Sequence, residues 1–501
     1  MKAIITLEDE VNATVTGLSK ADINELWNKY AVFAKNYFHR PKYKMGVWDG
    51  KIKFFTKNGK TYVRLLPEIV PILKEKGYGI KLNDKRLNYE ITIPYVDKNY
   101  LKENYGFNIE LAEHQVRCIN SLTSNNNGII LAGTGAGKTL MTAVLCDLYE
   151  KHMGFRSIVI VPRGDLITQT KDELLEHGVD CGEYGGSTKD TDHQHIVSTW
   201  QSLQNNKQFV SQFPVVIVDE CHGVSGQVLK DILNGPAAKA LVKIGLTGTL
   251  PEEDIDLMSI RVTLGHVVES VKGHELVKSG WLAMPNIHMV NLKENLREEY
   301  HDFCQRFPED CSNLKYSQFK RDFFPDFQSE KAHLQRREER IKFIAEMIET
   351  ASKRKKGNTL VLVPNIQFGQ KIAREIPDAI FFHGKDSKKI RKQIYETFDE
   401  ESNFVAITTY SLASTGLNIK RIFNFFMVDA GKSYIQIIQS IGRGLRKSHD
   451  KDTVNIFDIH SDLKFSKKHA TIREKHYKKE QYPYKKRTVE YLDLNRTLSE
   501  E

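Results

Sequence analysis

One stretch in the first third of the chain restricts the possible folds more than any other. Residues 129–131 form an apolar run short enough for a buried strand, and residues 140–149 are apolar at helical spacing. Between them lies a turn with three glycines that ends in Lys-Thr. A strand, a glycine-rich turn, Lys-Thr and a helix form a loop whose backbone N–H groups converge on phosphate oxygens. The residues of this phosphate loop are Gly133, Thr134, Gly135, Ala136, Gly137, Lys138 and Thr139.

Two side chains of the phosphate loop have predicted roles. Lys138 would reach the β and γ phosphates of a nucleotide, and the Thr139 hydroxyl would hold Mg²⁺. The usual pattern begins with glycine, whereas this chain has Ala132 at that position. The alternative interpretation is a plain strand–turn–helix connection, so further motifs are needed to decide.

Two acids supply the second half of such a nucleotide site. Residues 215–218 are four strand-forming residues, and they run directly into Asp219 and Glu220. Asp219 is predicted to bind Mg²⁺, and Glu220 to polarise the attacking water. The alternative is a pair of acids that merely ends a strand. A further strand at 244–246 leads into Thr247 and Thr249, which place small polar side chains at its end.

Composition limits the class of protein. The chain has 501 residues, enough for about three domains, and its 40% hydrophobic and 27% charged residues are typical of a soluble globular protein. No apolar run is long enough to span a membrane, and the N-terminus turns acidic too soon for a signal peptide. The six cysteines show neither CxxC nor zinc spacing, so we expect reduced thiols in a cytoplasmic protein. The net charge of +9 favours a polyanionic partner, although a merely basic enzyme would share it.

Residues 1–105 are predicted to form a small α+β accessory domain. Between residues 38 and 64, basic and aromatic side chains alternate around Asp49-Gly50, a pair that predicts a hairpin turn. Basic groups can meet phosphates while aromatic rings stack on bases, so we predict nucleic-acid contacts here. The alternative is a small sheet with a solvated charged face over core aromatics. The candidate contacts are Lys44, Trp48 and Lys51.

The rest of the chain predicts two α/β lobes with a helical segment between them. We place lobe 1 at 106–285, a helical insertion at 286–341, lobe 2 at 342–462 and a basic tail at 463–501. Lobe 2 lacks a phosphate loop but contains Arg443 and Arg446, three residues apart. Two guanidiniums beside a γ-phosphate stabilise transition-state charge as arginine fingers; otherwise they are a surface pair. The tail is either a nucleic-acid clamp or a terminal helix that frays.

Taken in order, these motifs resemble the motif series of the superfamily 2 helicases. The resemblance covers residues 106–462 and implies an α/β fold with two RecA-like parallel-sheet lobes and ATP in the cleft between them. It implies that Gln115 contacts adenine, that Gly416 and Asn418 lie near the ribose and the catalytic water, and that Thr247, Thr249 and Gln439 couple ATP to nucleic acid. The DNA contacts implied in the lobes are Arg163, Thr199, Trp200, His383 and Thr409.

Within the superfamily, the chain is similar to the phage UvsW-type helicases, which are relatives of RecG-like and XPB-like DNA translocases. The segment 43–52 resembles the aromatic and basic Gly-x-Trp-Asp-Gly segment of their accessory domain, and 276–285 is also similar. The resemblance implies ATP- and Mg²⁺-dependent unwinding or branch migration of forked and four-way DNA in phage recombination, repair and replication. It also implies a monomer on DNA in the host cytoplasm, with replication or recombination proteins as further partners.

Three other functions stay open on the sequence. An RNA helicase shares the Asp-Glu-x-His pattern of residues 219–222. A duplex DNA translocase would move without separating strands. A nucleotide-gated junction-binding module would hardly turn over, although the intact Glu220, Arg443 and Arg446 argue against it. The residue that splits a duplex is also undecided, with Trp48, Phe323 and Phe324 as candidates.

Overall fold

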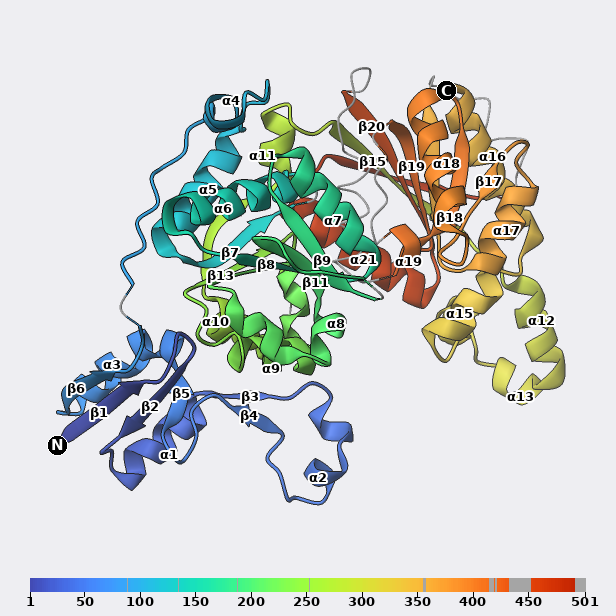
Figure 1. The fold of residues 1–501 in the computed structure, drawn as a ribbon. Coiled ribbons are helices and arrows are strands. Elements are labelled where there is room, and N and C mark those ends of the chain that lie inside the picture. The colour runs from blue at the N-terminus through green and yellow to red at the C-terminus, as the bar shows by residue number, and fades with distance from the viewer. Residues whose placement is uncertain are drawn as a thin grey trace. The chain divides into compact units, whose positions relative to one another are not determined.

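The computed structural model describes residues 1–87, 89–133, 135–186, 188–251, 253–354, 357–413, 419, 421–431 and 452–491. These residues form two compact units (Figure 1). Unit 1 contains Met1–Ala132 and Ala136–Val271, and unit 2 contains Gly133–Gly135 and Lys272–Glu501. Each unit is built on a largely or wholly parallel sheet, which confirms the predicted α/β fold class with two parallel-sheet lobes and an N-terminal accessory domain.

The N-terminal part of unit 1 is a small α+β domain. Its sheet has the order β5-β2-β1-β6, in which β1 pairs antiparallel with β2 and parallel with β6. Alternating residues of β1 and β2 are buried, as expected for a sheet with one face on a core. The elements are β1 (Lys2–Leu7), β2 (Asn12–Thr16), α1 (Lys20–Lys29), β5 (Lys60–Tyr62), α3 (Leu66–Glu75) and β6 (Gly79–Asp84).

An aromatic and basic projection interrupts this domain between α1 and β5. Strands β3 (Ala31–Phe33) and β4 (Lys51–Lys53) pair antiparallel, and the chain between them contains a 3₁₀ turn and α2 (Pro41–Lys44). The predicted hairpin turn at Asp49-Gly50 is therefore wrong. Gly50 instead closes the base of a longer excursion, because its carbonyl accepts a hydrogen bond from Ala34 N at 2.8 Å.

The main sheet of unit 1 has the order β10-β9-β11-β8-β12-β13-β7-β14, and only β10 is antiparallel to its neighbour. Its central strands are buried on both faces, which explains their continuous apolar sequences. The strands are β7 (Asn127–Ala132), β8 (Ser157–Val161), β9 (Cys181–Gly185), β10 (Thr188–Asp190), β11 (His195–Thr199), β12 (Val215–Asp219), β13 (Val242–Thr247) and β14 (Val267–Val271). The helices are α4 (Tyr100–Tyr105), α5 (Glu113–Asn125), α6 (Lys138–Met153), α7 (Asp165–Glu176), α8 (Trp200–Gln204), α9 (Gln227–Asn234) and α10 (Asp254–Leu264).

The small N-terminal domain shares a hydrophobic core with α10. Ile255 and Val262 of this helix are buried in the same cluster as Leu26, Phe54 and Leu73. Polar contacts continue the interface toward the amino ends of the main strands: Arg64 Nη2 donates to Asn127 Oδ1 at 3.0 Å, and Arg261 pairs with Glu68. The domain is therefore seated at the edge of the sheet where the parallel strands begin.

Unit 2 is built on a seven-stranded sheet with the order β17-β18-β16-β19-β20-β15-β21, in which every pair is parallel. Its strands are β15 (Met284–Leu292), β16 (Asn358–Val363), β17 (Ile380–Phe381), β18 (Val405–Thr409), β19 (Ile422–Val428), β20 (Thr453–Ser461) and β21 (Tyr484–Val489). Its helices are α11 (Gly273–Lys278), α12 (Arg297–Arg306), α13 (Pro308–Cys311), α14 (Tyr316–Asp322), α15 (Phe327–Leu334), α16 (Glu338–Arg354), α17 (Ile366–Arg374), α18 (Lys388–Glu400), α19 (Tyr410–Ala413) and α21 (Lys464–Lys479).

Two predicted segments differ in unit 2. The predicted helical insertion begins with a strand, because most of β15 falls within it, and the predicted basic tail supplies α21 and the edge strand β21. Helix α21 does not fray as a terminal helix would, since the fully buried Arg473 donates from Nη2 to Asp458 Oδ1 at 2.7 Å. The segments predicted as a linker and a tail thus complete the sheet of this unit.

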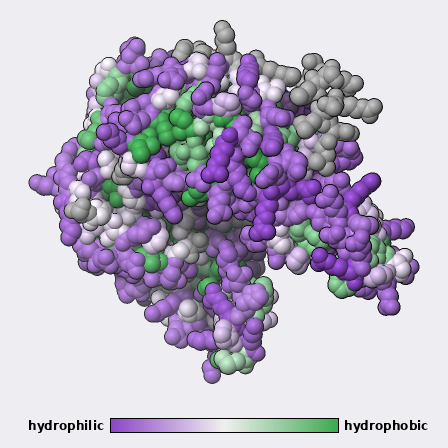
Figure 2. Space-filling view, turned by 90° about the vertical axis from the view of Figure 1, so that its right-hand side faces the viewer, coloured by the Kyte–Doolittle hydropathy of each residue, from purple (hydrophilic) through white to green (hydrophobic). Residues whose placement is uncertain are grey.

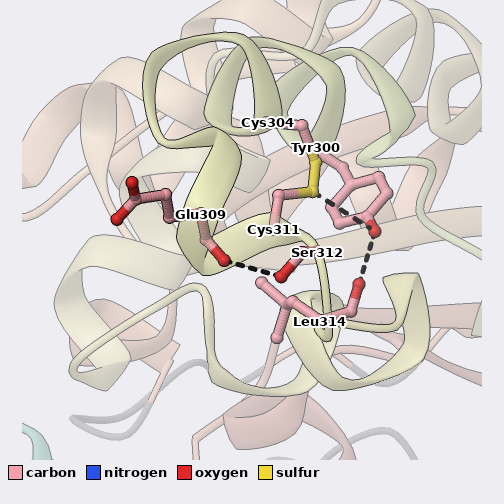
Figure 3. The surroundings of a disulfide bond; sticks show 6 residues. All are labelled: Tyr300, Cys304, Glu309, Cys311, Ser312 and Leu314. Carbon is pink, nitrogen blue, oxygen red and sulfur yellow. Dashed lines mark hydrogen bonds between the residues drawn. A yellow bond between two sulfur atoms is a disulfide. The ribbon is translucent and has the colours of Figure 1, made fainter.

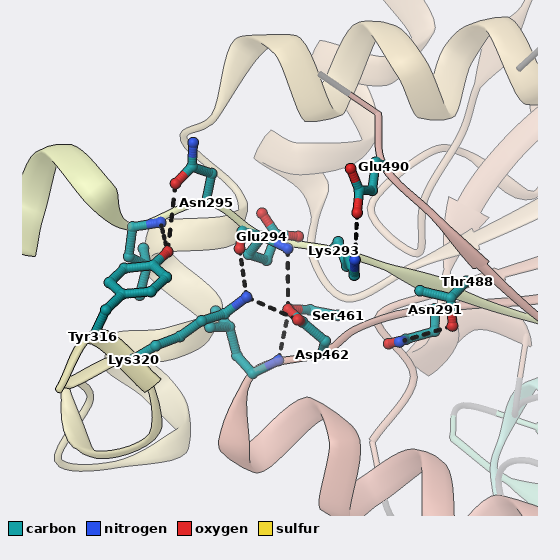
Figure 4. A network of polar contacts seen from close by, with 12 residues as sticks. Asn291, Lys293, Glu294, Asn295, Tyr316, Lys320, Ser461, Asp462, Thr488 and Glu490 are labelled. Carbon is teal, nitrogen blue, oxygen red and sulfur yellow. Dashed lines mark hydrogen bonds and ion pairs between the residues drawn. The ribbon is translucent and has the colours of Figure 1, made fainter. Parts of the chain in front are cut away.

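The helical segment that contains α12 to α15 is held at the end of β15 by a polar network through Lys320 of α14 (Figure 4). Lys320 Nζ donates to the Glu294 carbonyl at 2.5 Å and to Asp462 Oδ2 at 2.7 Å, while Glu294 N donates to Asp462 Oδ1 at 3.0 Å. Phe323 and Phe324 belong to the hydrophobic cluster beneath these helices, and Phe324 is buried. Burial argues against Phe324 as the side chain that splits a duplex, whereas Phe323 is only partly buried and stays a candidate.

The insertion also contains a disulfide. Cys304 and Cys311 are bonded, and Tyr300 beside them donates its hydroxyl to the Leu314 carbonyl at 2.5 Å (Figure 3). The expectation that the cysteines are reduced is therefore wrong for this pair, because two cysteines seven positions apart can meet where one helix turns into the next. Cys118, Cys146, Cys181 and Cys221 are buried and do not take part in this disulfide.

Hydrophilic side chains predominate on the face drawn in Figure 2, and hydrophobic ones gather only in small patches. Within the described part of the chain, none of the helices combines the length and the apolar character needed to cross a membrane.

Candidate active site

The predicted nucleotide residues meet at one edge of the main sheet of unit 1. Strands β12, β13 and β7 are consecutive parallel neighbours, so their carboxyl ends lie side by side. Ala132, Asp219 and Thr247 are the last residues of these strands. In parallel sheets ligands bind beyond this edge, so topology alone brings three separate sequence motifs together.

The phosphate loop connects β7 to the 16-residue helix α6. Gly135 and Gly137 have φ of 88° and 80°, a region that glycine adopts without strain. Ala132 is a buried strand residue without positive φ, which explains why alanine is accepted where the pattern usually has glycine. The first turn of α6 directs its unpaired N–H groups and its dipole toward the loop, an arrangement suited to anions.

A compact group of polar side chains faces the loop. Lys138 Nζ donates to the Ala132 carbonyl at 3.2 Å and lies 3.9 Å from Glu220 Oε1. The other carboxylate oxygen of Glu220 is 3.3 Å from both Thr247 Oγ1 and His222 Nδ1. Glu220 has φ of 48°, a conformation that is rare for a non-glycine residue and is often found at functional sites.

Asp219 and Thr249 add buried oxygens to this group. Asp219 Oδ1 and Thr249 Oγ1 are both buried and have no hydrogen-bond partner among the described residues. Burial, and then the negative charge of Glu220, raise the pKa of Asp219 to about 6. An unpartnered carboxylate oxygen next to a second acid is a poor arrangement for stability and a good one for a hard divalent cation. The residues present therefore fit Mg²⁺.

Gln115 has a different position from the one expected of an adenine contact. It is fully buried, its Oε1 accepts from Ala112 N at 2.9 Å, and its Nε2 donates to the Ala136 carbonyl at 3.1 Å. His114 Nε2 lies 3.0 Å from the same carbonyl. In this geometry the Gln115 amide supports the phosphate loop, and contact with adenine stays a prediction.

The predicted nucleic-acid residues of unit 1 form two groups. Arg163 follows β8, and Thr199 ends the neighbouring parallel strand β11 just before Trp200, so all three lie at the same edge of the sheet as the phosphate loop. Thr199 is buried and caps α8 by accepting from Ser202 N at 3.2 Å, which favours a structural role for its hydroxyl. Arg163 is an exposed cation paired with Asp165 at 3.0 Å.

The second group is the projection of the N-terminal domain. Lys51 Nζ lies 4.7 Å from the centre of the Phe33 ring, and the Arg40 guanidinium lies 5.5 Å from that of Trp48. Trp48 Nε1 donates to the Lys51 carbonyl at 3.0 Å, which fixes this ring, and Lys44 is exposed at the end of α2. Cations held over half-exposed rings offer both phosphate and base contacts.

The predicted residues of unit 2 lie partly outside the described chain. Thr409 is the buried last residue of β18, and His383 lies two residues after the paired strand β17, with its Nδ1 3.1 Å from Asp386 Oδ2. The remaining residues have no structural account, because they fall outside the described ranges. They are Thr134, Gly416, Asn418, Gln439, Arg443 and Arg446.

Three residues that sequence reasoning gave no role contact the site. His222 holds the Thr247 hydroxyl at 3.0 Å, His114 supports the phosphate loop, and Trp281 Nε1 donates to the Gly135 carbonyl at 2.6 Å. His222 could have been found from its place directly after the two acids. Trp281 lies in the segment 276–285 that resembles the helicase family, but nothing local in the sequence indicates its partner, which is 146 positions away.

Comparison with known proteins gives an independent view of the same regions. Residues 8–83 match the family "DNA helicase UvsW, N-terminal", 108–252 match "Type III restriction enzyme, res subunit", and 339–448 match "Helicase conserved C-terminal domain". The chain is 24% identical over 479 residues to the ATP-dependent DNA helicase uvsW of Enterobacteria phage T4, covering 91% of this chain and 90% of that protein.

Solved structures agree on the fold. A fragment of an HsdR subunit of a type I restriction enzyme from Vibrio vulnificus matches with a TM-score of 0.55 and 18% identity, over 80% of this chain and 70% of that one. A variant of S. cerevisiae Dbp5 bound to RNA matches with a TM-score of 0.51 and 14% identity, over 79% and 93% of the two chains. The matches to the family models and to the phage T4 protein confirm the predicted resemblance: the chain is similar to the UvsW-type ATP-dependent DNA helicases of superfamily 2.

Proposed function

We propose that this chain hydrolyses ATP to move on DNA and that it unwinds or branch-migrates forked and four-way DNA during phage recombination, repair and replication. It would act as a monomer on DNA in the cytoplasm of the host cell. One observation carries the enzymatic part of the proposal. Lys138, Glu220 and Thr247 converge at the edge where two buried oxygens, of Asp219 and Thr249, lack partners among the described residues.

Each residue of this group has a definite task in the proposal. The loop N–H groups and Lys138 hold the phosphates, and Thr139 and Asp219 hold Mg²⁺, which supplies neutralising charge at the phosphates. Glu220 orients and polarises the attacking water. His222 and Thr247 position its carboxylate from the opposite side to Lys138. Arg443 and Arg446 stay the predicted fingers.

Two further observations support DNA as the nucleic acid on which the chain moves. The projection of the N-terminal domain holds cations over rings at 4.7 and 5.5 Å, an arrangement that suits a backbone with exposed bases. The family that matches this domain and the T4 relative are both named as DNA helicases. Dbp5 shares the fold while bound to RNA, so the fold alone does not choose between DNA and RNA.

The test is the ATPase rate measured without nucleic acid and with single-stranded DNA, duplex, fork, four-way junction and matched RNA. We expect the strongest stimulation with the fork or the junction, and its loss in Glu220→Gln, which retains the shape of the side chain but not the charge. A strand-displacement assay with and without a fork separates unwinding from translocation alone. Stimulation by RNA only would overturn the DNA assignment, and a rate indifferent to every nucleic acid would overturn the motor.

A further inference from the structure

The phosphate loop is held by its carbonyl groups. In a trans peptide unit the C=O of one residue and the N–H of the next point in opposite directions. The Ala136 carbonyl accepts from Gln115 Nε2 at 3.1 Å, so the Gly137 N–H points away from Gln115. The Gly135 carbonyl accepts from Trp281 Nε1 at 2.6 Å, so the Ala136 N–H points away from Trp281. The orientations of two consecutive N–H groups, those of Ala136 and Gly137, are thus set by side chains that bind the carbonyl on the opposite side of each peptide unit.

Close neighbours also leave little room for a side chain at either glycine. A Cβ on Gly137 would lie 2.2 Å from Gln115 Nε2, and a Cβ on Gly135 would lie 2.8 Å from the side chain of Leu282. Leu282 is buried next to Trp281, so indole and isobutyl groups support Gly135 together. Two glycines of the motif are therefore explained by their supports as well as by their positive φ.

The end of helix α11 determines where Trp281 points. Gly280 has φ of 74°, and the N–H groups of Trp281 and Leu282 both donate to the Leu276 carbonyl, at 2.8 and 3.0 Å. This hooked helix end directs the two side chains back toward Gly135, which belongs to the same unit. Strand β15 begins at Met284, three positions after Trp281, so only a short segment of chain separates the indole from the sheet of unit 2.

We infer that Trp281 is a positioning residue for the phosphate loop and a sensor of its occupancy by a nucleotide phosphate. The inference rests on the proposed function, since it presumes that the loop binds ATP. When the loop N–H groups bind phosphate, the Gly135 peptide becomes more polarised and its carbonyl a better acceptor for the indole. A shift of that carbonyl would move Trp281 and, within three residues, the start of β15.

The decisive variant is Trp281→Phe, which keeps the ring and removes the N–H donor. Because a neutral hydrogen bond contributes about 1 kcal/mol, we expect the dissociation constants of Mg²⁺–ADP and of a non-hydrolysable ATP analogue to rise about fivefold. The KM for ATP should rise by the same factor while kcat stays within about twofold, because the loop binds substrate and transition state alike. Trp27→Phe, which changes a tryptophan of the N-terminal domain in the same way, should leave both constants unchanged.

A second measurement does not alter Trp281. In a chain with Trp27, Trp48 and Trp200 all replaced by phenylalanine, the fluorescence of Trp281 should change on addition of Mg²⁺–ADP, with the same midpoint as calorimetric binding. Unchanged fluorescence, or wild-type nucleotide affinity in Trp281→Phe, would overturn the inference while the proposed function stands. Failure of the wild-type chain to bind either nucleotide by calorimetry would instead refute the proposed function, and this inference with it.

Discussion

Asp219 and its neighbours show how a site can be built at the expense of stability. Its carboxylate is buried beside Glu220, and one oxygen has no protein partner in the described chain. Such groups persist where they serve a ligand, because natural proteins accept destabilising side chains at functional sites. The buried oxygen without a protein partner, which costs stability, is also the one that suits a cation.

Asp219→Asn should therefore stabilise the chain and inactivate it at once. Without Mg²⁺ and nucleotide we expect the free energy of unfolding of unit 1 to rise by about 1–3 kcal/mol, because a buried negative charge next to Glu220 is removed. The ATPase rate should fall by about a hundredfold or more. Denaturant unfolding and a steady-state ATPase assay measure both changes. A variant that is less stable than wild type would contradict this view of the site.

Lys243 is a buried cation far from this edge. It is fully buried at the start of β13, and its ammonium group donates to the Ala238 and Ala240 carbonyls at 3.1 and 2.7 Å. Burial, and then the charge of Arg64, lower the pKa of Lys243 from its ordinary 10.5 to about 7, while Glu10 and Asp9 oppose the shift. Between these two values the unfolded chain binds a proton that the folded chain does not.

Stability should consequently rise with pH above about 7. Each pH unit in this window contributes about 1 kcal/mol from Lys243, since the unfolded lysine is the protonated one. In Lys243→Met this contribution is absent, so the stability difference between variant and wild type should shift in favour of wild type from pH 7 to pH 9. Unfolding midpoints in urea at four pH values test this, and parallel profiles of the two proteins would refute it.

At the scale of elements, a buried ion network connects α16 to two strands of unit 2. Arg340 on α16 donates from Nε to Glu294 Oε1 at 3.0 Å and from Nη2 to Asp429 Oδ1 at 2.6 Å. All three side chains are buried, and the Tyr491 hydroxyl donates to the second oxygen of Glu294 at 2.5 Å. The network ties α16 to the ends of β15 and β19.

Arg340→Met should destabilise unit 2 by about 3–5 kcal/mol, because it leaves two carboxylates buried without their cation. Adding Glu294→Gln and Asp429→Asn to this variant should recover much of the loss, since both uncompensated charges are then removed. Thermal unfolding of the single and triple variants measures the effect. If the triple variant is no more stable than Arg340→Met, the charge explanation fails and packing of the guanidinium dominates.

The success of prediction from sequence follows the burial of each element. Strand β12 was predicted within one residue at each end, because a strand buried on both faces has an unbroken apolar sequence. Strand β21, with the sequence YKKRTV, was interpreted as part of a basic tail. It is an exposed edge strand, and its pairing with β15 depends on residues almost 200 positions away, which local pattern does not encode.

Some residues of the candidate site could also be predicted from the sequence, and others could not. Lys138, Asp219, Glu220 and Thr247 were found because each follows a strand in a pattern with a known chemical purpose, and the sheet order brings them together. Their roles stay predictions. The support of the phosphate loop by Gln115 and Trp281 was not foreseen, because it depends on contacts between side chains and carbonyl groups that no motif specifies.

At the scale of the whole molecule, the N-terminal domain is part of the structure of unit 1. Ile255 and Val262 of α10 are buried in its core, and Arg64 and Glu68 bind the main sheet and α10. The contacts lie near the amino ends of the strands, whereas the candidate site lies at their carboxyl ends. The domain and the site therefore occupy opposite edges of one sheet.

A chain lacking residues 1–88 should consequently be poorly soluble, because removing the domain exposes an apolar face of α10. Adding Ile255→Gln and Val262→Gln to the truncated chain should restore a soluble species, since these side chains would then face water. Size-exclusion chromatography of the two truncated chains makes the comparison. If the unmodified truncated chain is monomeric and folded, the interface is less important than the buried contacts indicate.

The contact between the N-terminal domain and α10 has a consequence for the residence time of the protein on a DNA ligand. A DNA segment bound to the projection would be presented to the loops of the same unit without a flexible tether, so no tether entropy reduces its local concentration. Two weak DNA-binding sites joined in this way bind with a higher combined affinity, and the DNA dissociates only when both sites release it at the same time. Residence time would then depend on the stiffness of the interface around α10 as much as on any single contact with DNA.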